Sequence, residues 1–203
     1  MDTLKRLIEI LGVTLPAGHK PPLALPIDRV ALAKTFADLD LNVGAEVGVE
    51  QGIYADLLLT ANPNLTLYAI DAWQHYRGYR DHVNQTKLDG FEQTTRQRLA
   101  PHKHGEVIKG FSAEVVRDFP EGSLDFVYLD ANHAFDFIME DLIHWGRRVR
   151  RGGIIAGHDF IRQSHVWVVQ AVHLYAYGHG IETWFTTTEP PTGETRSFVL
   201  VKP

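Results

Sequence analysis

The chain has no cysteine among its 203 residues. This absence excludes disulfide bonds, thiolate zinc sites and cysteine nucleophiles together. Long hydrophobic runs are missing too, and residues 1–14 are amphipathic, mixed in charge and without a small-residue cleavage site. We therefore expect neither a membrane span nor a signal peptide, and a cytoplasmic protein.

An excess of positive charge is also absent. The formal net charge is −5, and the sequence pI is about 6.1. A protein that binds nucleic acid needs basic side chains to neutralise phosphates, so neither nucleic acid nor a membrane is an expected partner. The arginine-rich run at 147–151 ends a predicted helix, where cations complement the helix dipole.

The chain divides into two parts by its pattern. Residues 1–42 combine an amphipathic helix, a proline-rich linker and a second helix that begins after Asp28. Residues 43–203 alternate strands and helices and form the predicted catalytic domain. The N-terminal arm is a candidate contact with a second subunit, so a homo-oligomer stays open.

Seven strands are predicted in this second part, at residues 45–49, 65–70, 106–108, 124–129, 154–156, 181–186 and 197–201. Helical segments separate the first six strands, which predicts a parallel sheet with right-handed crossovers. The turn-rich EPPTGET is too short for a crossover helix, so the last strand should run antiparallel. The expected fold is α/β, Rossmann-like and doubly wound, with helices on both faces.

The turn after the first strand reads Glu46-Val47-Gly48-Val49-Glu50-Gln51-Gly52. A dinucleotide fingerprint would need glycines at 50 and 53, where the chain has Glu50 and Ile53. A carboxylate would also repel a pyrophosphate. A cationic cofactor such as S-adenosylmethionine suits this turn, and Asp71, at the end of the second strand, suits its ribose hydroxyls.

These motifs, together with FVYLDANH and GGIIAGHD, make the chain resemble the class I S-adenosylmethionine-dependent methyltransferases. It is most similar to the small-molecule group that includes the catechol and macrolide-sugar O-methyltransferases, from about residue 43 to the end. The resemblance implies cofactor contacts around the methionine part, the ribose and the adenine. These are Glu46, Gly48 and Gly52 for the methionine part, Asp71 and the bordering Trp73 for the ribose, and Ser112 near the adenine.

Asp130 and Asp159 end adjacent predicted strands, so both carboxylates should face one crevice. Two carboxylates can bind Mg²⁺ or a similar divalent cation, as acids at these positions do in metal-dependent members of the resembled group. The group's third ligand position holds Phe160, which cannot coordinate. His158 could substitute, although strand alternation points it elsewhere. The alternative is that the carboxylates cap loops or that Asp130 binds the cofactor amine.

His133 follows Asp130 by three residues and is the predicted general base, because a near-neutral imidazole can accept a proton from a hydroxyl. With Asp130 it forms the predicted catalytic pair. A loop-bonding histidine is the competing interpretation. The aromatic and cationic cluster from Trp73 to Arg80 is a candidate lid over the substrate.

The sequence thus predicts methyl transfer from S-adenosylmethionine to a small molecule, at oxygen and with or without a metal. Nitrogen or carbon methylation stays open, although no Asn-Pro-Pro-Tyr motif follows the fourth strand. Two further alternatives are a metal-dependent hydroxylase-like enzyme and a non-catalytic module that keeps the cofactor pocket. The acceptor cannot be read from the sequence.

Overall fold

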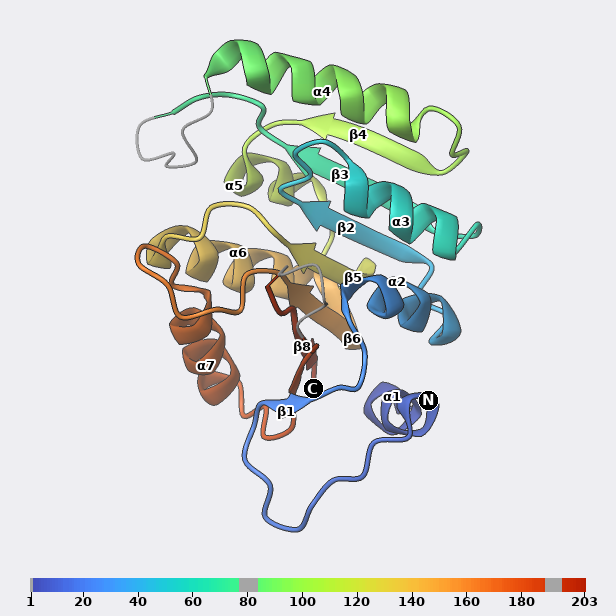
Figure 1. Cartoon of the computed structure of the whole chain (residues 1–203), viewed down its shortest axis with the longest axis vertical. Coiled ribbons are helices and arrows are strands. Elements are labelled where there is room, and N and C mark those ends of the chain that lie inside the picture. The colour runs from blue at the N-terminus through green and yellow to red at the C-terminus, as the bar shows by residue number, and fades with distance from the viewer. Residues whose placement is uncertain (1, 77–83, 189–194) are drawn as a thin grey trace.

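The computed structural model describes residues 2–76, 84–188 and 195–203 (Figure 1). Its helices are α1 (Thr3–Leu11), α2 (Arg29–Asp38), α3 (Ile53–Ala61), α4 (Gln85–Leu99), α5 (Ser112–Val115), the 3₁₀ helix η1 (Val116–Asp118), α6 (Phe135–Arg148) and α7 (Val168–Gly178). Its strands are β1 (Leu23–Ala24), β2 (Val43–Val47), β3 (Thr66–Asp71), β4 (Gly105–Lys109), β5 (Leu124–Leu129), β6 (Val149–Gly157), β7 (Phe185–Thr186) and β8 (Phe198–Val201).

The strands form one sheet in the order β1-β7-β8-β6-β5-β2-β3-β4. All ladders are parallel except those of β8, which runs antiparallel to both β6 and β7. The predicted Rossmann-like α/β fold with a reversed last strand is confirmed. The predicted strand count was one too low, because the described residues form a sheet of eight strands rather than seven. The turn at 189–194 lies outside the described residues.

The strand that the sequence did not predict is β1, which comes from the proline-rich part of the arm. Leu23 donates its backbone N–H to the Trp184 carbonyl at 3.0 Å, and Leu25 donates to the Thr186 carbonyl at 2.8 Å. This short ladder adds the arm to the edge of the sheet beside β7. Two residues show no alternation of their own, so only a tertiary partner makes them a strand.

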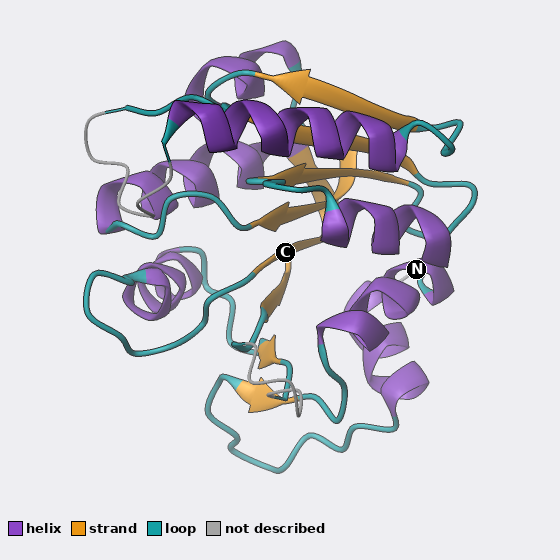
Figure 2. Ribbon diagram, turned by 45° about the horizontal axis from the view of Figure 1, so that its top comes forward, coloured by secondary structure: helices purple, strands orange, loops and turns teal. Residues whose placement is uncertain are grey.

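Helices cover both faces of the sheet (Figure 2). Each face has its own hydrophobic core. One core collects side chains from α1, α2, α3 and α4, and the other from α6 and α7. Leu7 and Leu32 of the arm are fully buried in the first core. At about 25 cal/mol per Å² of apolar surface removed from water, such side chains attach the arm firmly to the sheet.

Local signals explain where several elements begin and end. The side chain of Asp2 caps α1 by accepting from the N–H of Leu4 and Lys5. Arg147 and Arg148 lie in the last turn of α6, as predicted for that basic run. Helix α4 begins at Gln85, where the Asn84 side chain caps it by accepting from the Lys87 N–H. No helix among the described residues has the length and apolar character to span a bilayer.

The chain order in the sheet reverses between β2 and β5. From β2 the chain proceeds to β3 and β4 on one side, whereas β5 and β6 lie on the other side. In open parallel sheets, such a switch point leaves a crevice beyond the carboxyl ends of the strands. The turns after β2, β3, β5 and β6 therefore meet at one edge of the sheet.

Candidate functional site

A cavity of about 960 Å³ opens at this edge. Nine of the ten side chains or backbone positions singled out in the sequence line it. They are Glu46, Gly48, Asp71, Trp73, Ser112, Asp130, His133, His158 and Asp159. The tenth, Gly52, opens α3 with φ +74° and packs against Thr95 behind the cavity wall. The topology thus brings strand-end residues from distant parts of the sequence into one hollow.

Gly48 joins the two strands at the switch point. Its φ is +91°, and a Cβ there would lie 2.2 Å from the carbonyl oxygen of Asp130. Its N–H donates to the Ile70 carbonyl at 2.8 Å, and the N–H of Asp130 donates to the Val47 carbonyl at 2.7 Å. Only glycine permits this conformation and this close approach, so the turn after β2 packs directly on the turn after β5.

Asp71 holds the turn after β2 in place. One carboxylate oxygen accepts from the Glu50 N–H at 2.9 Å, and the other accepts from the Trp73 N–H at 2.8 Å. Burial raises the pKa of Asp71, and these backbone hydrogen bonds oppose the rise. The fully buried Trp73 indole and the Thr95 hydroxyl both donate to the Glu50 carbonyl, at 2.8 and 2.9 Å. These hydrogen bonds stabilise the conformation of the turn.

At one end of the cavity, which we call the Ser112 end, the side chains form a closed hydrogen-bond network. Ser112 donates its hydroxyl to the buried Asp141 and accepts from the Trp145 indole N–H at 2.8 Å. Burial raises the pKa of Asp141 to about 7, against the opposing hydrogen bond from Ser112. Aromatic rings of Phe111 and Phe137 flank this end.

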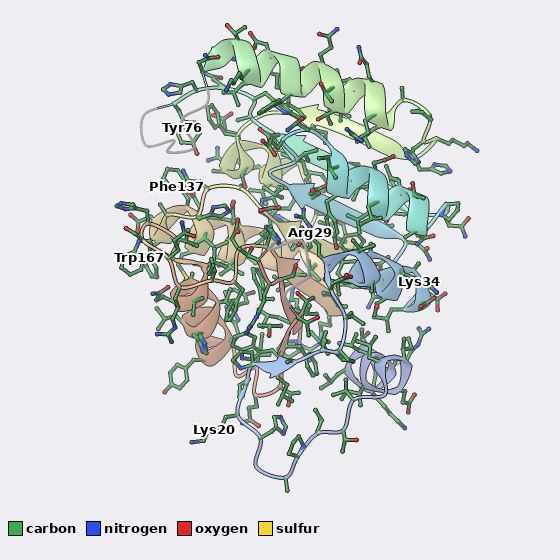
Figure 3. All side chains as sticks on the ribbon, in the orientation of Figure 1. Lys20, Arg29, Lys34, Tyr76, Phe137 and Trp167 are labelled. Atoms are coloured by element: carbon green, nitrogen blue, oxygen red, sulfur yellow. The ribbon has the colours of Figure 1, made fainter. Side chains whose placement is uncertain are left out.

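Tyr76 belongs to the predicted lid and lies at the same end (Figure 3). Its hydroxyl accepts from the Asn132 amide at 2.8 Å, and its ring meets Phe111 edge-on with centroids 5.6 Å apart. Arg77, Tyr79 and Arg80 lie outside the described residues, so the lid prediction is untested for them.

The opposite end, here the Asp130 end, gathers two carboxylates and two imidazoles. The Nε2 atom of His133 is 3.1 Å from Oδ2 of Asp159 and 3.7 Å from Oδ1 of Asp130. The Nδ1 atom of His158 is 3.7 Å from each aspartate. Burial alone would raise the pKa of Asp159, but His158, His133 and Thr195 hold it well below its ordinary range.

The expected orientation of the His158 side chain is wrong. Strand alternation predicts that its side chain points away from the aspartates, yet it lines the cavity beside them. The reason is local, because β6 ends at Gly157 and Asp159 has φ +51°. Alternation applies only inside a regular strand, and the chain has already left it at these residues.

The Asp130 end has donors that fit a divalent cation. One ligand atom from each of Asp130, His133 and Asp159 lies within 4.8 Å of the others. Phe160 does not contribute, because its ring packs on Trp184 with centroids 5.6 Å apart. A mixed set of carboxylate oxygen and imidazole nitrogen can bind several divalent metals.

Arg29 is a cavity residue that the sequence did not reveal. It lies at the start of α2, in the arm, and its Nη2 atom is 3.2 Å from Oδ2 of Asp130. Beside it lies Glu46, which is 1% exposed. Burial raises the pKa of Glu46 well above its usual value, and the Arg29 charge opposes this rise. An arginine between a proline-rich linker and a helix carries no motif, so no sequence signal pointed to it.

Known proteins share both the sequence pattern and the fold. A family model described as a methyltransferase domain matches residues 45–160. The O-methyltransferase TomG from Streptomyces achromogenes, solved with S-adenosylmethionine, has a TM-score of 0.64 and 17% identity, with 100% of this chain and 91% of that chain covered. An O-methyltransferase from Bacillus cereus, solved with S-adenosylhomocysteine, has a TM-score of 0.56 and 16% identity, with the same coverage.

A further methyltransferase has a comparable fold. The precorrin-6y C5,15-methyltransferase from Geobacter metallireducens has a TM-score of 0.60 and 13% identity, with 86% of this chain and 87% of that chain covered. A search of curated proteins finds none that matches the sequence. At these identities the structural neighbours establish the fold, whereas the family model establishes the kind of domain.

Proposed function

The chain belongs to this methyltransferase domain family, and from that premise we propose that it transfers the methyl group of S-adenosylmethionine to an oxygen of a small molecule. The observation that carries the proposal is the charge of the cavity. Carboxylates of Glu46, Asp71, Asp130 and Asp159 all line it. Such a wall attracts a sulfonium and an ammonium and repels a pyrophosphate.

The donor lies along the turns after β2 and β3 in this proposal. Glu46 and Gly48 border the methionine part, and Asp71 accepts from the ribose hydroxyls with the lone pairs that its two backbone hydrogen bonds leave free. Ser112 borders the adenine. Trp73 and Gly52 support the donor site indirectly. The Trp73 indole donates to the Glu50 carbonyl, and Gly52 precedes the first turn of α3.

His133 is the general base for the acceptor hydroxyl. Its imidazole takes the proton while the oxygen attacks the methyl group in line with the departing sulfur. The imidazolium that forms lies close to two carboxylates, since its Nε2 atom is 3.1 Å from Asp159 and 3.7 Å from Asp130. Their negative charge stabilises the protonated ring, so Asp130 and Asp159 favour the proton transfer.

A divalent cation fits the same residues. Asp130, His133 and Asp159 would hold it, and the ion would lower the pKa of an acceptor hydroxyl. With an ion in place His133 would be a ligand, and without one it would act as the base. The dependence of turnover on added metal distinguishes these roles.

Calorimetry tests the cofactor. The protein should bind S-adenosylmethionine and S-adenosylhomocysteine tightly and a nicotinamide dinucleotide weakly. Titrations with Mg²⁺ or Mn²⁺ then ask whether a metal binds and whether turnover needs it. Absence of S-adenosylmethionine binding would refute the proposal and favour the hydroxylase-like alternative. Binding without turnover on any hydroxylated acceptor would favour the non-catalytic module or a nitrogen or carbon acceptor.

Location and assembly remain predictions from composition and pattern. The acidic charge balance supports a small-molecule partner rather than nucleic acid. We infer a cytoplasmic enzyme, and the homo-oligomer stays an open prediction that sedimentation would test.

A further inference from the structure

Arg29 enters the cavity from outside the residues that the family model matches, 45–160. Its side chain is only 18% exposed, and it points toward the ends of the central strands (Figure 3). The guanidinium carbon lies 4.3 Å from the Tyr54 ring centroid and 5.5 Å from that of Tyr128. The two rings therefore fix the plane of the guanidinium group inside the cavity.

Among the residues that the structure describes, most donors of this guanidinium have no acceptor. Five N–H groups are available, and Asp130 is the polar partner found within the described part of the chain. The buried Nε atom has no hydrogen-bond partner there. A buried donor without an acceptor costs about 1–3 kcal/mol, so the arrangement favours a ligand that supplies the missing acceptor.

The neighbouring acid, Glu46, lacks a hydrogen-bond donor rather than an acceptor in the part of the chain that the structure describes. Oε2 of Glu46 is buried and has no hydrogen-bond partner among the described residues. Glu46 and Arg29 line the same cavity and interact electrostatically. One group lacks an acceptor and the other lacks a donor, so a ligand with both a carboxylate and an ammonium group would satisfy them together.

We infer that Arg29 binds the α-carboxylate of the methionine tail of S-adenosylmethionine, with Glu46 facing the ammonium group of the same tail. This inference rests on the proposed function and adds a cofactor-binding residue from the arm. It also gives the arm a role, because α2 must be docked for the tail to be held. A carboxylate on the acceptor would engage Arg29 but would leave Oε2 of Glu46 unsatisfied.

The test compares two cofactors that differ by one group. Calorimetry measures the affinity of wild type, Arg29→Gln and Arg29→Lys for S-adenosylmethionine and for decarboxylated S-adenosylmethionine, without acceptor. The matched control is Arg117→Gln, which removes an exposed arginine that borders the same cavity near Ser112. Thermal melts check that each variant is folded.

We expect Arg29→Gln to weaken S-adenosylmethionine binding by about ten- to a hundredfold, the range of a charged hydrogen bond. Its affinity for the decarboxylated compound should stay near that of wild type. Arg29→Lys should lie between, because an ammonium keeps the charge but loses the planar fork. Arg117→Gln should leave the ratio of the two affinities unchanged.

Four results would count against the inference. Equal losses for both cofactors in Arg29→Gln, or no loss, would overturn it while the proposed function stands. If wild type binds neither cofactor, the proposed function fails as well. If Arg29→Gln does not fold, wild type and Arg29→Lys decide, and equal affinity of wild type for both cofactors overturns the inference.

Discussion

The two ends of the cavity differ in how completely their polar groups are hydrogen-bonded. At the Ser112 end, Ser112, Asp141 and Trp145 satisfy one another in a closed network. At the Asp130 end, charged groups lie close together, yet Arg29 Nε and Glu46 Oε2 have no hydrogen-bond partner in the described parts of the chain. The polar groups of the first end satisfy one another, whereas the second end has buried polar atoms that the inferred cofactor contacts would satisfy.

This difference indicates that the two ends have different roles. A closed network in a low-dielectric interior holds a fixed surface, which suits recognition of a rigid ring system. Buried polar atoms without a partner are costly, so the end with close charges and such atoms is where we expect ligand binding and proton transfer. Substitutions at the Asp130 end should therefore affect ligands and turnover, and those at the Ser112 end should affect stability.

The largest expected effect is on turnover, from His133→Ala. Loss of a general base should lower kcat by about 10²- to 10⁴-fold with cofactor affinity unchanged. Steady-state kinetics and calorimetry with S-adenosylmethionine measure the two quantities. The control is His104→Ala, an exposed histidine outside the cavity. An unchanged kcat in His133→Ala would remove the base assignment.

At the Ser112 end, Asp141→Asn should change the pH dependence of stability. The pKa of Asp141 is about 7 in the folded protein against an ordinary value of 3.8, so the folded state retains a proton that the unfolded chain releases. Stability should therefore fall as pH rises from about 4 to 7, by about 4 kcal/mol in wild type.

Asn cannot ionise but still accepts from Ser112, so Asp141→Asn should be flatter over this range and more stable than wild type at pH 7. Urea denaturation at several pH values measures the difference. A variant that follows the wild-type pH profile would show that Asp141 does not cause the slope.

Asp71→Ala probes the position between the two ends. It should weaken S-adenosylmethionine binding by at least about tenfold and destabilise the fold by about 1–3 kcal/mol, because the Glu50 and Trp73 N–H groups lose their acceptor. Asp71→Asn, which keeps an amide oxygen, should lose less of both. Calorimetry and denaturation give the two numbers, and unchanged affinity in Asp71→Ala would mean that the ribose lies elsewhere.

The smallest expected effect is from Trp145→Phe, which removes the indole donor to Ser112 but keeps an aromatic ring against Phe119. Stability should fall by about 1–2 kcal/mol, with kcat nearly unchanged. Thermal or urea denaturation and a turnover assay check this. A large loss of kcat would contradict the division of roles between the two ends.

Much of the fold was predictable because its signals are local. The strand 124–129 was predicted with the observed bounds, since a short, mostly apolar run followed by Asp130 has few other interpretations. Residues at strand ends were predictable as neighbours, because parallel strands bring their carboxyl ends to one edge. The division at residue 42 stays a prediction, although Leu7 and Leu32 of the arm share a core with the sheet.

By itself, the sequence determined the strand–helix alternation, the reversed final strand and the set of acids at the strand ends, because these depend on patterns within a few residues. The tertiary structure alone decided that β1 joins the sheet, that His158 turns toward the aspartates and that Arg29 of the arm meets Asp130. Each of these depends on contacts between residues far apart in the chain, and their positions are set by the packing of whole elements. No local pattern carries that information.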